Sequence, residues 1–256
     1  HTSIQLPAAK SISNRALILH ALAQGHIAPS NLSDCDDTRV MIKALDGNPG
    51  HIDILAAGTA MRFLTAYLSV TPGTRIITGT KRMQQRPIRI LVDALRELGA
   101  QIEYAGKEGF PPLSITGTEL TGEEISLAGN VSSQYISALL MIGPILKNGL
   151  RLNLTGEIIS RPYINLTLQL MKEFGADAAW SSESSITVRP SKYKDIPFTV
   201  ESDWSGASYW YQMVALILDN EKEESTKTEI KLPGLLPRSH QGDSRGAEIF
   251  AKLGVH

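Results

Sequence analysis

Three helix-like segments of this chain end in the same way, at nearly constant intervals. Each segment closes on a large apolar residue followed by a glycine, at Gly99, Gly175 and Gly254. These glycines lie 76 and 79 residues apart, and Arg86-Pro87 and Arg161-Pro162 introduce the first two segments. Glycine commonly ends helices because it adopts a positive φ without steric cost. A shared ending at a fixed interval therefore predicts a repeated structural unit.

Strand-like and helix-like patterns alternate between these endings, which predicts an α/β fold built from repeated units. We expect strands near residues 52–55, 75–78, 101–104, 113–116, 124–127, 150–154, 176–180, 185–188, 198–200 and 229–232. We expect helices near residues 11–23, 36–45, 57–69, 88–98, 132–146, 162–174, 203–218 and 242–253. The charged run at 221–227 is predicted to be a solvated loop or hairpin.

The length, net charge and cysteine content of the chain limit the kinds of protein it can be. With 256 residues the chain is long enough for two domains. Its formal net charge of −1 gives no overall attraction to nucleic acid or to an anionic membrane. Cys35 is the only cysteine, and no apolar run reaches membrane-spanning length, so we expect a cytoplasmic protein. The helical pattern runs almost to the last residue, so we expect the sequence to be incomplete at its C-terminal end.

Polar and basic residues gather where the predicted helices begin. The densest group is 10–15 (Lys-Ser-Ile-Ser-Asn-Arg), whose Lys10, Ser11, Asn14 and Arg15 are expected to share one face opposite a buried apolar face. The others lie at 58–62, 82–86, 132–134 and 160–163. Any single group is explained equally well as a helix cap. Together they predict one pocket, lined by helix N-termini and cations, for a ligand with more than one phosphate or carboxylate.

Other chemistries find less support in the residues. There is no Gly-rich nucleotide-binding motif, P-loop or nucleophile elbow, and the six histidines lack metal-binding spacing. His20 is expected to be an ordinary packed side chain on the first helix. Cys35 lies among carboxylates, which predicts a raised thiol pKa and no nucleophilic role. Asp36 and Asp37 are interpreted as helix caps in preference to acid–base groups.

Several segments together resemble the 5-enolpyruvylshikimate-3-phosphate synthases (3-phosphoshikimate 1-carboxyvinyltransferases), within the enolpyruvyl transferase family. They occur in that family's order and cover nearly the whole chain. The matching segments are 6–7, 10–15, 36–39, 57–62, 82–83, 86–88, 132–140, 160–163, 203 with 205, 207–209 and 241–243.

The resemblance implies two globular domains, each made of three βαβαββ units, with the active site between them. Residues 10–200 would form one domain, and residues 1–9 with 201–256 would form part of the other, which is unfinished here. The chain departs from the family pattern at Ala8, Ala9, Ala56 and Phe63, and its stretch 45–58 is unusually short. One unit is therefore expected to have lost strands.

The resemblance also implies transfer of the enolpyruvyl group of phosphoenolpyruvate to the 5-hydroxyl of shikimate 3-phosphate, in a monomeric enzyme without metal or organic cofactor. Lys10 would be the catalytic residue, lying between the two substrates. The shikimate 3-phosphate residues would be Lys10, Ser11, Arg15, Ser132, Ser133, Gln134, Ser160 and Tyr163. The phosphoenolpyruvate residues would be Lys10, Gly58, Arg86 and Gln134, and the small Gly58 predicts sensitivity to the inhibitor glyphosate. The proton-transferring carboxylates would lie after residue 256, so this segment alone is not expected to turn over.

Two alternatives stay open at this point. The first is the related enolpyruvyl transferase acting on UDP-N-acetylglucosamine, although that family usually begins its site with Lys-Asn and carries its cysteine elsewhere than position 35. The second is a non-catalytic relative that binds phosphate ligands. A nucleic-acid-processing enzyme on a related repeat is disfavoured by the near-zero charge and the lack of a basic stripe.

Overall fold

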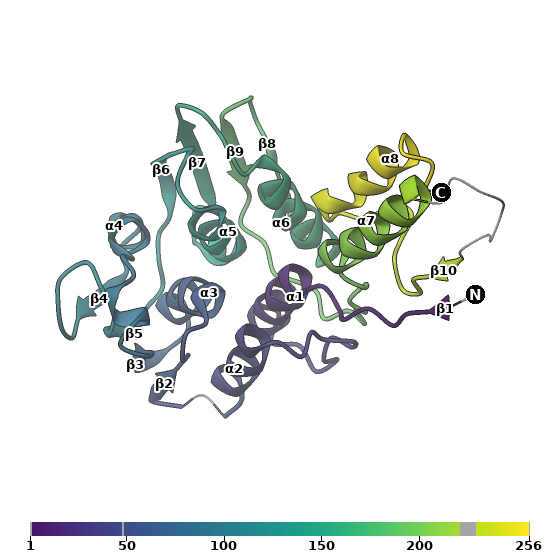
Figure 1. Ribbon diagram of the computed structural model, residues 1–256. Coiled ribbons are helices and arrows are strands. Elements are labelled where there is room, and N and C mark those ends of the chain that lie inside the picture. The colour runs from purple at the N-terminus through teal and green to yellow at the C-terminus, as the bar shows by residue number, and fades with distance from the viewer. Residues whose placement is uncertain (1, 48, 221–228, 256) are drawn as a thin grey trace.

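The computed structural model describes residues 2–47, 49–220 and 229–255, and Figure 1 shows their arrangement. The loop predicted at 221–227 lies outside the described residues. Two four-stranded sheets flank a group of central helices, and a smaller layer of helices lies at the end where the two termini are found.

The two sheets have the same topology. The first has the order β2-β3-β5-β4, and the second has the order β6-β7-β9-β8. In each sheet the first two strands run parallel and the others antiparallel, with Ile52 opposite Ile77 in one sheet and Ile125 opposite Leu152 in the other. The strands are β2 (His51–Asp53), β3 (Gly73–Thr78), β4 (Gln101–Tyr104), β5 (Leu113–Gly117), β6 (Glu123–Ala128), β7 (Leu150–Thr155), β8 (Ala178–Trp180) and β9 (Ser185–Val188).

Helices connect the strands in the same sequence in both units. In the first unit, α3 follows β2 and α4 follows β3; in the second, α5 follows β6 and α6 follows β7. Both units therefore read βαβαββ, which confirms the repeat. The helices are α3 (Gly58–Ser69), α4 (Arg89–Glu97), α5 (Ser133–Ile142) and α6 (Arg161–Glu173), with the short 3₁₀ turns η1 (Met83–Gln85) and η2 (Gly143–Ile145).

A third pair of helices, α1 (Lys10–Leu22) and α2 (Asp36–Leu45), has no sheet of its own among the described residues. The strand predicted at 198–200 is wrong: only Thr199 pairs, in an isolated bridge with Ser30. A second isolated bridge joins Ala8 to Ser202. One bridged pair is too short to form a ladder, so among the described residues this helix pair is joined to its neighbours by isolated bridges.

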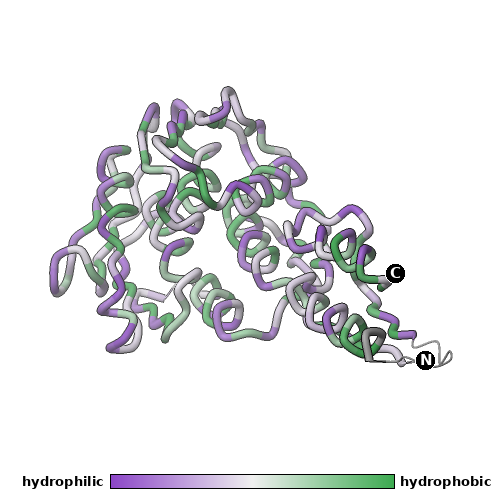
Figure 2. Tube along the Cα trace, turned by 45° about the horizontal axis from the view of Figure 1, so that its top comes forward, coloured by the Kyte–Doolittle hydropathy of each residue, from purple (hydrophilic) through white to green (hydrophobic). Residues whose placement is uncertain are grey.

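The main core lies where α1, α3, α5 and α6 contact one another between the sheets. Apolar residues, green in Figure 2, run along the middle of the molecule, and polar residues follow the outer loops. In α5 every residue from Tyr135 to Ile142 is buried. Helix α1 is buried on nearly all sides from Ile12 to Leu19, so the predicted division into one polar and one apolar face is wrong. Asn14 and Arg15 point into protein.

A second, smaller hydrophobic cluster contains Leu6, Trp204 and Ala207. Around it lie the parallel pair β1 (Thr2–Ser3) and β10 (Ile230–Lys231), with α7 (Trp204–Asn220), the 3₁₀ turn η3 (Gly242–Arg245) and α8 (Gly246–Ala251). The helix predicted at 242–253 is therefore a 3₁₀ turn followed by a short helix, since glycines at 242 and 246 favour helix poorly. Similarly, α5 stops at Ile142, because Pro144 cannot continue its hydrogen bonding. Within the described residues, no helix has both the length and the apolarity to cross a membrane.

Candidate functional site

The predicted polar groups meet because four helices begin at the same place. The side-chain amide of Gln134, at the start of α5, donates to the Thr59 hydroxyl at the start of α3 (3.2 Å). The Thr59 backbone N–H donates to Asp37 Oδ1 in the first turn of α2 (3.0 Å). Asp37 Oδ2 is 3.9 Å from the ammonium of Lys10, the first residue of α1. The starts of α1, α2, α3 and α5 thus form one continuous polar cluster.

Most of these helix starts are not capped by their own side chains. Ala9 and Ala57 occupy the caps of α1 and α3, and Ser160 at the cap of α6 makes no capping hydrogen bond. Among α1, α2, α3, α5 and α6, only α5 is capped locally, by the Ser132 hydroxyl, which accepts from Gln134 N–H. The reading of these groups as ordinary caps therefore fails for α1, α3 and α6. At α3 the Thr59 N–H is instead taken by Asp37 of α2, whereas the starts of α1 and α6 have no side-chain cap, so their partial positive charge can attract an anion.

Gly58 allows two arginines to come close to the start of α3. A β-carbon at position 58 would lie 2.5 Å from Arg86 Nη1 and 3.0 Å from Arg62 Nη1. Arg62 also donates to the Gly58 carbonyl (3.0 Å). The backbone beside the exposed Arg86 is held by α5, because Tyr135 donates its hydroxyl to the Pro87 carbonyl (2.8 Å). A larger residue at position 58 would therefore displace the end of the Arg86 side chain from this place.

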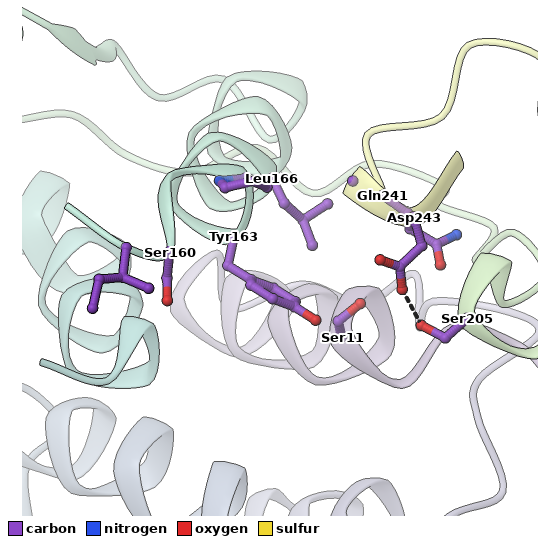
Figure 3. Close-up of a pocket in the computed structure, with 10 residues that line it drawn as sticks. Ser11, Ser160, Tyr163, Leu166, Ser205, Gln241 and Asp243 are labelled. Atoms are coloured by element: carbon purple, nitrogen blue, oxygen red, sulfur yellow. Dashed lines mark hydrogen bonds between the residues drawn. The ribbon is translucent and has the colours of Figure 1, made fainter. Parts of the chain in front are cut away.

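A pocket of about 280 Å³ adjoins this cluster on the side of Ser11 (Figure 3). Ser11 from α1 and Ser160 and Tyr163 from the start of α6 face it, so three predicted residues share one cavity. From the other side come Ser205, at the start of α7, and Asp243, in η3, and the Ser205 hydroxyl donates to the Asp243 carboxylate. The remaining lining residues are Ile159, Pro162, Leu166, Gln241 and Gly242. Hydroxyl groups are the main polar groups of this pocket, and the cations of the site lie in the neighbouring cluster of helix starts.

Comparison with known proteins shows the family to which this chain belongs. The sequence model of the family described as EPSP synthase (3-phosphoshikimate 1-carboxyvinyltransferase) matches residues 1–47 and 48–256. The chain belongs to the EPSP synthase family. It is similar to the 3-phosphoshikimate 1-carboxyvinyltransferase of Bacteroides fragilis, with 71% identity over 99% of this chain and 60% of that protein. The enzyme of the same name from Shewanella halifaxensis is 37% identical over 99% of this chain and 64% of its own length.

The chain thus spans about three fifths of the length of these relatives of the EPSP synthase family. Among solved structures, EPSP synthase from Acinetobacter baumannii has the same fold, with a TM-score of 0.72 and 23% identity over 84% of this chain and 53% of that one. The matches favour this family over the UDP-N-acetylglucosamine enolpyruvyl transferases considered as the alternative.

Within this EPSP synthase-family site, Arg15 differs most from expectation. Its side chain is only 3% exposed and lies between helices. It donates to Thr167 Oγ1 (2.7 Å), to Ser137 Oγ (2.9 Å) and to the Ser11 carbonyl (2.8 Å). Burial lowers the Arg15 pKa to about 10, partly opposed by Tyr163, so the guanidinium stays charged at neutral pH. In this structure Arg15 hydrogen-bonds the Ser11 carbonyl and Thr167 of α6 from within the protein. Its contact with a ligand remains a prediction.

Sequence reasoning also missed residues that the structure places in the site. Asp37 was interpreted as a cap of its own helix, but its carboxylate accepts the Thr59 N–H of α3 and lies close to the Lys10 ammonium. Arg62, Ser205 and Asp243 lay in motifs that carried the resemblance without being assigned a role. Their part depends on neighbours far away in the chain, which composition and periodicity cannot supply.

Two minor expectations are also resolved. The prediction of a raised Cys35 pKa is wrong: burial raises it, but hydrogen bonds from Ser33 and Thr38 lower it by more, so the pKa is lowered overall. His20 is a half-buried side chain on α1, with its Nδ1 4.0 Å from Asp195 Oδ1. No group of three or more His, Cys, Asp or Glu residues in the described part of the chain is arranged to hold a metal ion.

Proposed function

We propose that this protein transfers the enolpyruvyl group of phosphoenolpyruvate to the 5-hydroxyl of shikimate 3-phosphate and releases phosphate. The observation that carries the proposal is the meeting of helix starts in one site. Lys10 is linked to Gln134 through Asp37 and Thr59, and Arg86 lies beside Gly58, the residue before Thr59. Ser11, next to Lys10, lines the pocket with the hydroxyl groups. The names of the curated relatives support the same reaction.

The arrangement suits two small anionic substrates. Arg86 and Lys10 supply positive charge for phosphoenolpyruvate beside Gly58, where a larger residue would displace Arg86. Ser132, Ser133, Gln134, Ser160 and Tyr163 supply hydroxyl and amide groups for shikimate 3-phosphate, with Ser11 and Arg15 on α1. Lys10 adjoins both groups, so its ammonium can stabilise negative charge on either substrate as they react. The residues that transfer protons are proposed to lie outside residues 1–256.

The same family membership supports a place in aromatic amino acid biosynthesis and a cytoplasmic, monomeric enzyme that uses no cofactor and binds neither nucleic acid nor membrane. The near-neutral net charge of −1 and the single cysteine agree with this proposal. We propose that residues 1–256 bind shikimate 3-phosphate but do not release phosphate when both substrates are present.

Calorimetric titration of shikimate 3-phosphate into this chain tests the proposal. Ser133→Ala and Tyr163→Phe each remove one hydroxyl from the site, and each is expected to weaken binding about tenfold, the effect of one hydrogen bond to a charged ligand. Ser126→Ala, on the exposed side of β6, is the matched control and should leave the affinity unchanged. Absence of binding, or equal affinities for all four proteins, would overturn the proposal.

A further inference from the structure

Two positively charged side chains meet at Gly58 without a carboxylate between them. The nitrogens Arg86 Nη1 and Arg62 Nη1 both contact the position that a Gly58 β-carbon would occupy. Neither arginine forms an ion pair within the described residues. Asp37 weakly raises the Arg62 pKa, but its carboxylate accepts the Thr59 N–H and lies 3.9 Å from the Lys10 ammonium.

Arg62 is the less accessible of the pair. Its side chain is 5% exposed, and its Nε is buried without a hydrogen-bond partner. Of its five donors, Nη1 donates to the Gly58 carbonyl (3.0 Å). The Tyr135 side chain, whose ring lies 5.8 Å from the central carbon of Arg62, contributes a further hydrogen bond that raises the Arg62 pKa. Burial lowers the Arg62 pKa, and the neighbouring Arg86 lowers it further. A buried cation beside a second cation destabilises the empty site.

A negatively charged ligand at Gly58 would compensate the buried charge of Arg62 and its repulsion from Arg86. A phosphate group carries about −1.5 to −2 charges at neutral pH, enough to balance two guanidinium groups. A carboxylate carries one charge and leaves one arginine uncompensated. The exposed Arg86 guanidinium also matches phosphate oxygens in geometry, through parallel N–H donors.

We propose that Arg62 is a positioning residue that makes the anion site at Gly58 selective for a dianionic phosphate. It acts through its neighbours: it holds the Gly58 carbonyl and, with Tyr135, fixes the space into which Arg86 reaches. Its buried charge raises the positive potential there without touching the ligand. The inference deepens the proposed function and rests on it for the identity of the substrate, but the selectivity for dianions is a property of the site itself.

Inorganic phosphate and acetate are the probes, each titrated calorimetrically at a pH where phosphate is mainly dianionic. Arg62→Gln is expected to weaken phosphate binding about tenfold and acetate binding much less, so that the ratio of the two affinities falls. Arg62→Lys keeps the charge and should preserve most of the ratio. Arg96→Gln, at the far end of α4 and bonded to the Ile102 carbonyl, is the control and should match the unmodified protein.

A purely structural role would lower the melting temperature of Arg62→Gln while leaving the phosphate-to-acetate ratio unchanged, and that result would overturn the proposal. If Arg62→Gln does not fold, Arg62→Met is titrated in its place. In the unmodified protein, phosphate affinity should also rise as the pH increases through the second ionisation of phosphate, and a flat response would count against the proposal. Phosphate selectivity without any binding of shikimate 3-phosphate would overturn the proposed function and leave this inference standing.

Discussion

Gly58 lies at the start of α3, and the guanidinium groups of Arg62 and Arg86 lie close to the position that a β-carbon would take. Gly58→Ala places a methyl group 2.5 Å from Arg86 Nη1, so the flexible Arg86 side chain must move away. We expect affinity for phosphoenolpyruvate to fall about tenfold, because a charged hydrogen bond is lost, while stability changes little. Calorimetry measures the first effect and thermal unfolding the second.

Gly50→Ala is the control for this substitution, because a β-carbon there has no atom within 4 Å. Unchanged phosphoenolpyruvate affinity in Gly58→Ala would show that Arg86 does not hold the ligand.

Asp195 makes stability depend on pH. Its carboxylate accepts N–H bonds from His26 (2.8 Å) and Ile27 (3.2 Å), and its pKa is lowered below the ordinary 3.8, mainly by the His26 bond. A lowered carboxylate pKa stabilises the fold above the unfolded-state pKa, and this contribution is lost as the pH falls through the folded-state value. We therefore expect Asp195→Asn to be less stable than the unmodified protein at pH 6, with the difference shrinking as the pH falls below about 4.

Urea denaturation of both proteins at several pH values measures that difference. Asp177→Asn, which removes an exposed carboxylate paired with Arg189, is the comparison. A constant difference between Asp195→Asn and the unmodified protein from pH 6 to pH 3 would contradict the assignment.

At the scale of elements, α3 depends on a side chain from α2 for its N-terminus. Asp37 accepts the Thr59 N–H, whereas Ala57 at the cap of α3 offers no side-chain acceptor. Asp37→Ala is expected to lower the free energy of unfolding by about 1 kcal/mol, the usual value of an N-cap, and to free Lys10 from its nearest carboxylate. Asp36→Ala removes an exposed carboxylate one residue away and serves as the control. Equal unfolding free energies for the two variants would refute the capping role.

The same contacts show how far the sequence predicts this fold. The three glycine endings and the alternating patterns predicted a repeated α/β unit, and two sheets of the same topology confirm the repeat, because these signals are local to each strand and helix. The burial of Arg15 was missed because its partners Ser137 and Thr167 lie 122 and 152 residues away. The strand at 198–200 failed because pairing needs a neighbour, and only Ser30 supplies one.

At the scale of the whole molecule, two hydrophobic clusters of unequal size are joined by two extended segments. Ala9 N–H donates to the Glu201 carbonyl and Asp203 N–H to the Pro7 carbonyl. The two segments that connect the clusters are therefore hydrogen-bonded to each other. The smaller cluster fully buries Leu6, Trp204 and Ala207, while α7 leaves Tyr209 65% exposed and Met213 49% exposed. This division agrees with the predicted domains 10–200 and 1–9 plus 201–256, which remain a prediction.

Unfolding in urea tests that division, because stability grows with buried apolar area and the smaller cluster has little. The chain has three tryptophans, and Trp180→Phe leaves only Trp204 and Trp210, both in the smaller cluster. In this variant we expect tryptophan fluorescence to change at a lower urea concentration than far-UV circular dichroism, which follows the helices of the larger core. The reverse variant, with Trp204 and Trp210 both replaced by Phe, reports through Trp180 on α6 and β8 and should follow the circular dichroism. Coincident transitions in both variants would mean that the two clusters unfold as one cooperative unit, and the proposed domain boundary near residue 200 would then be wrong.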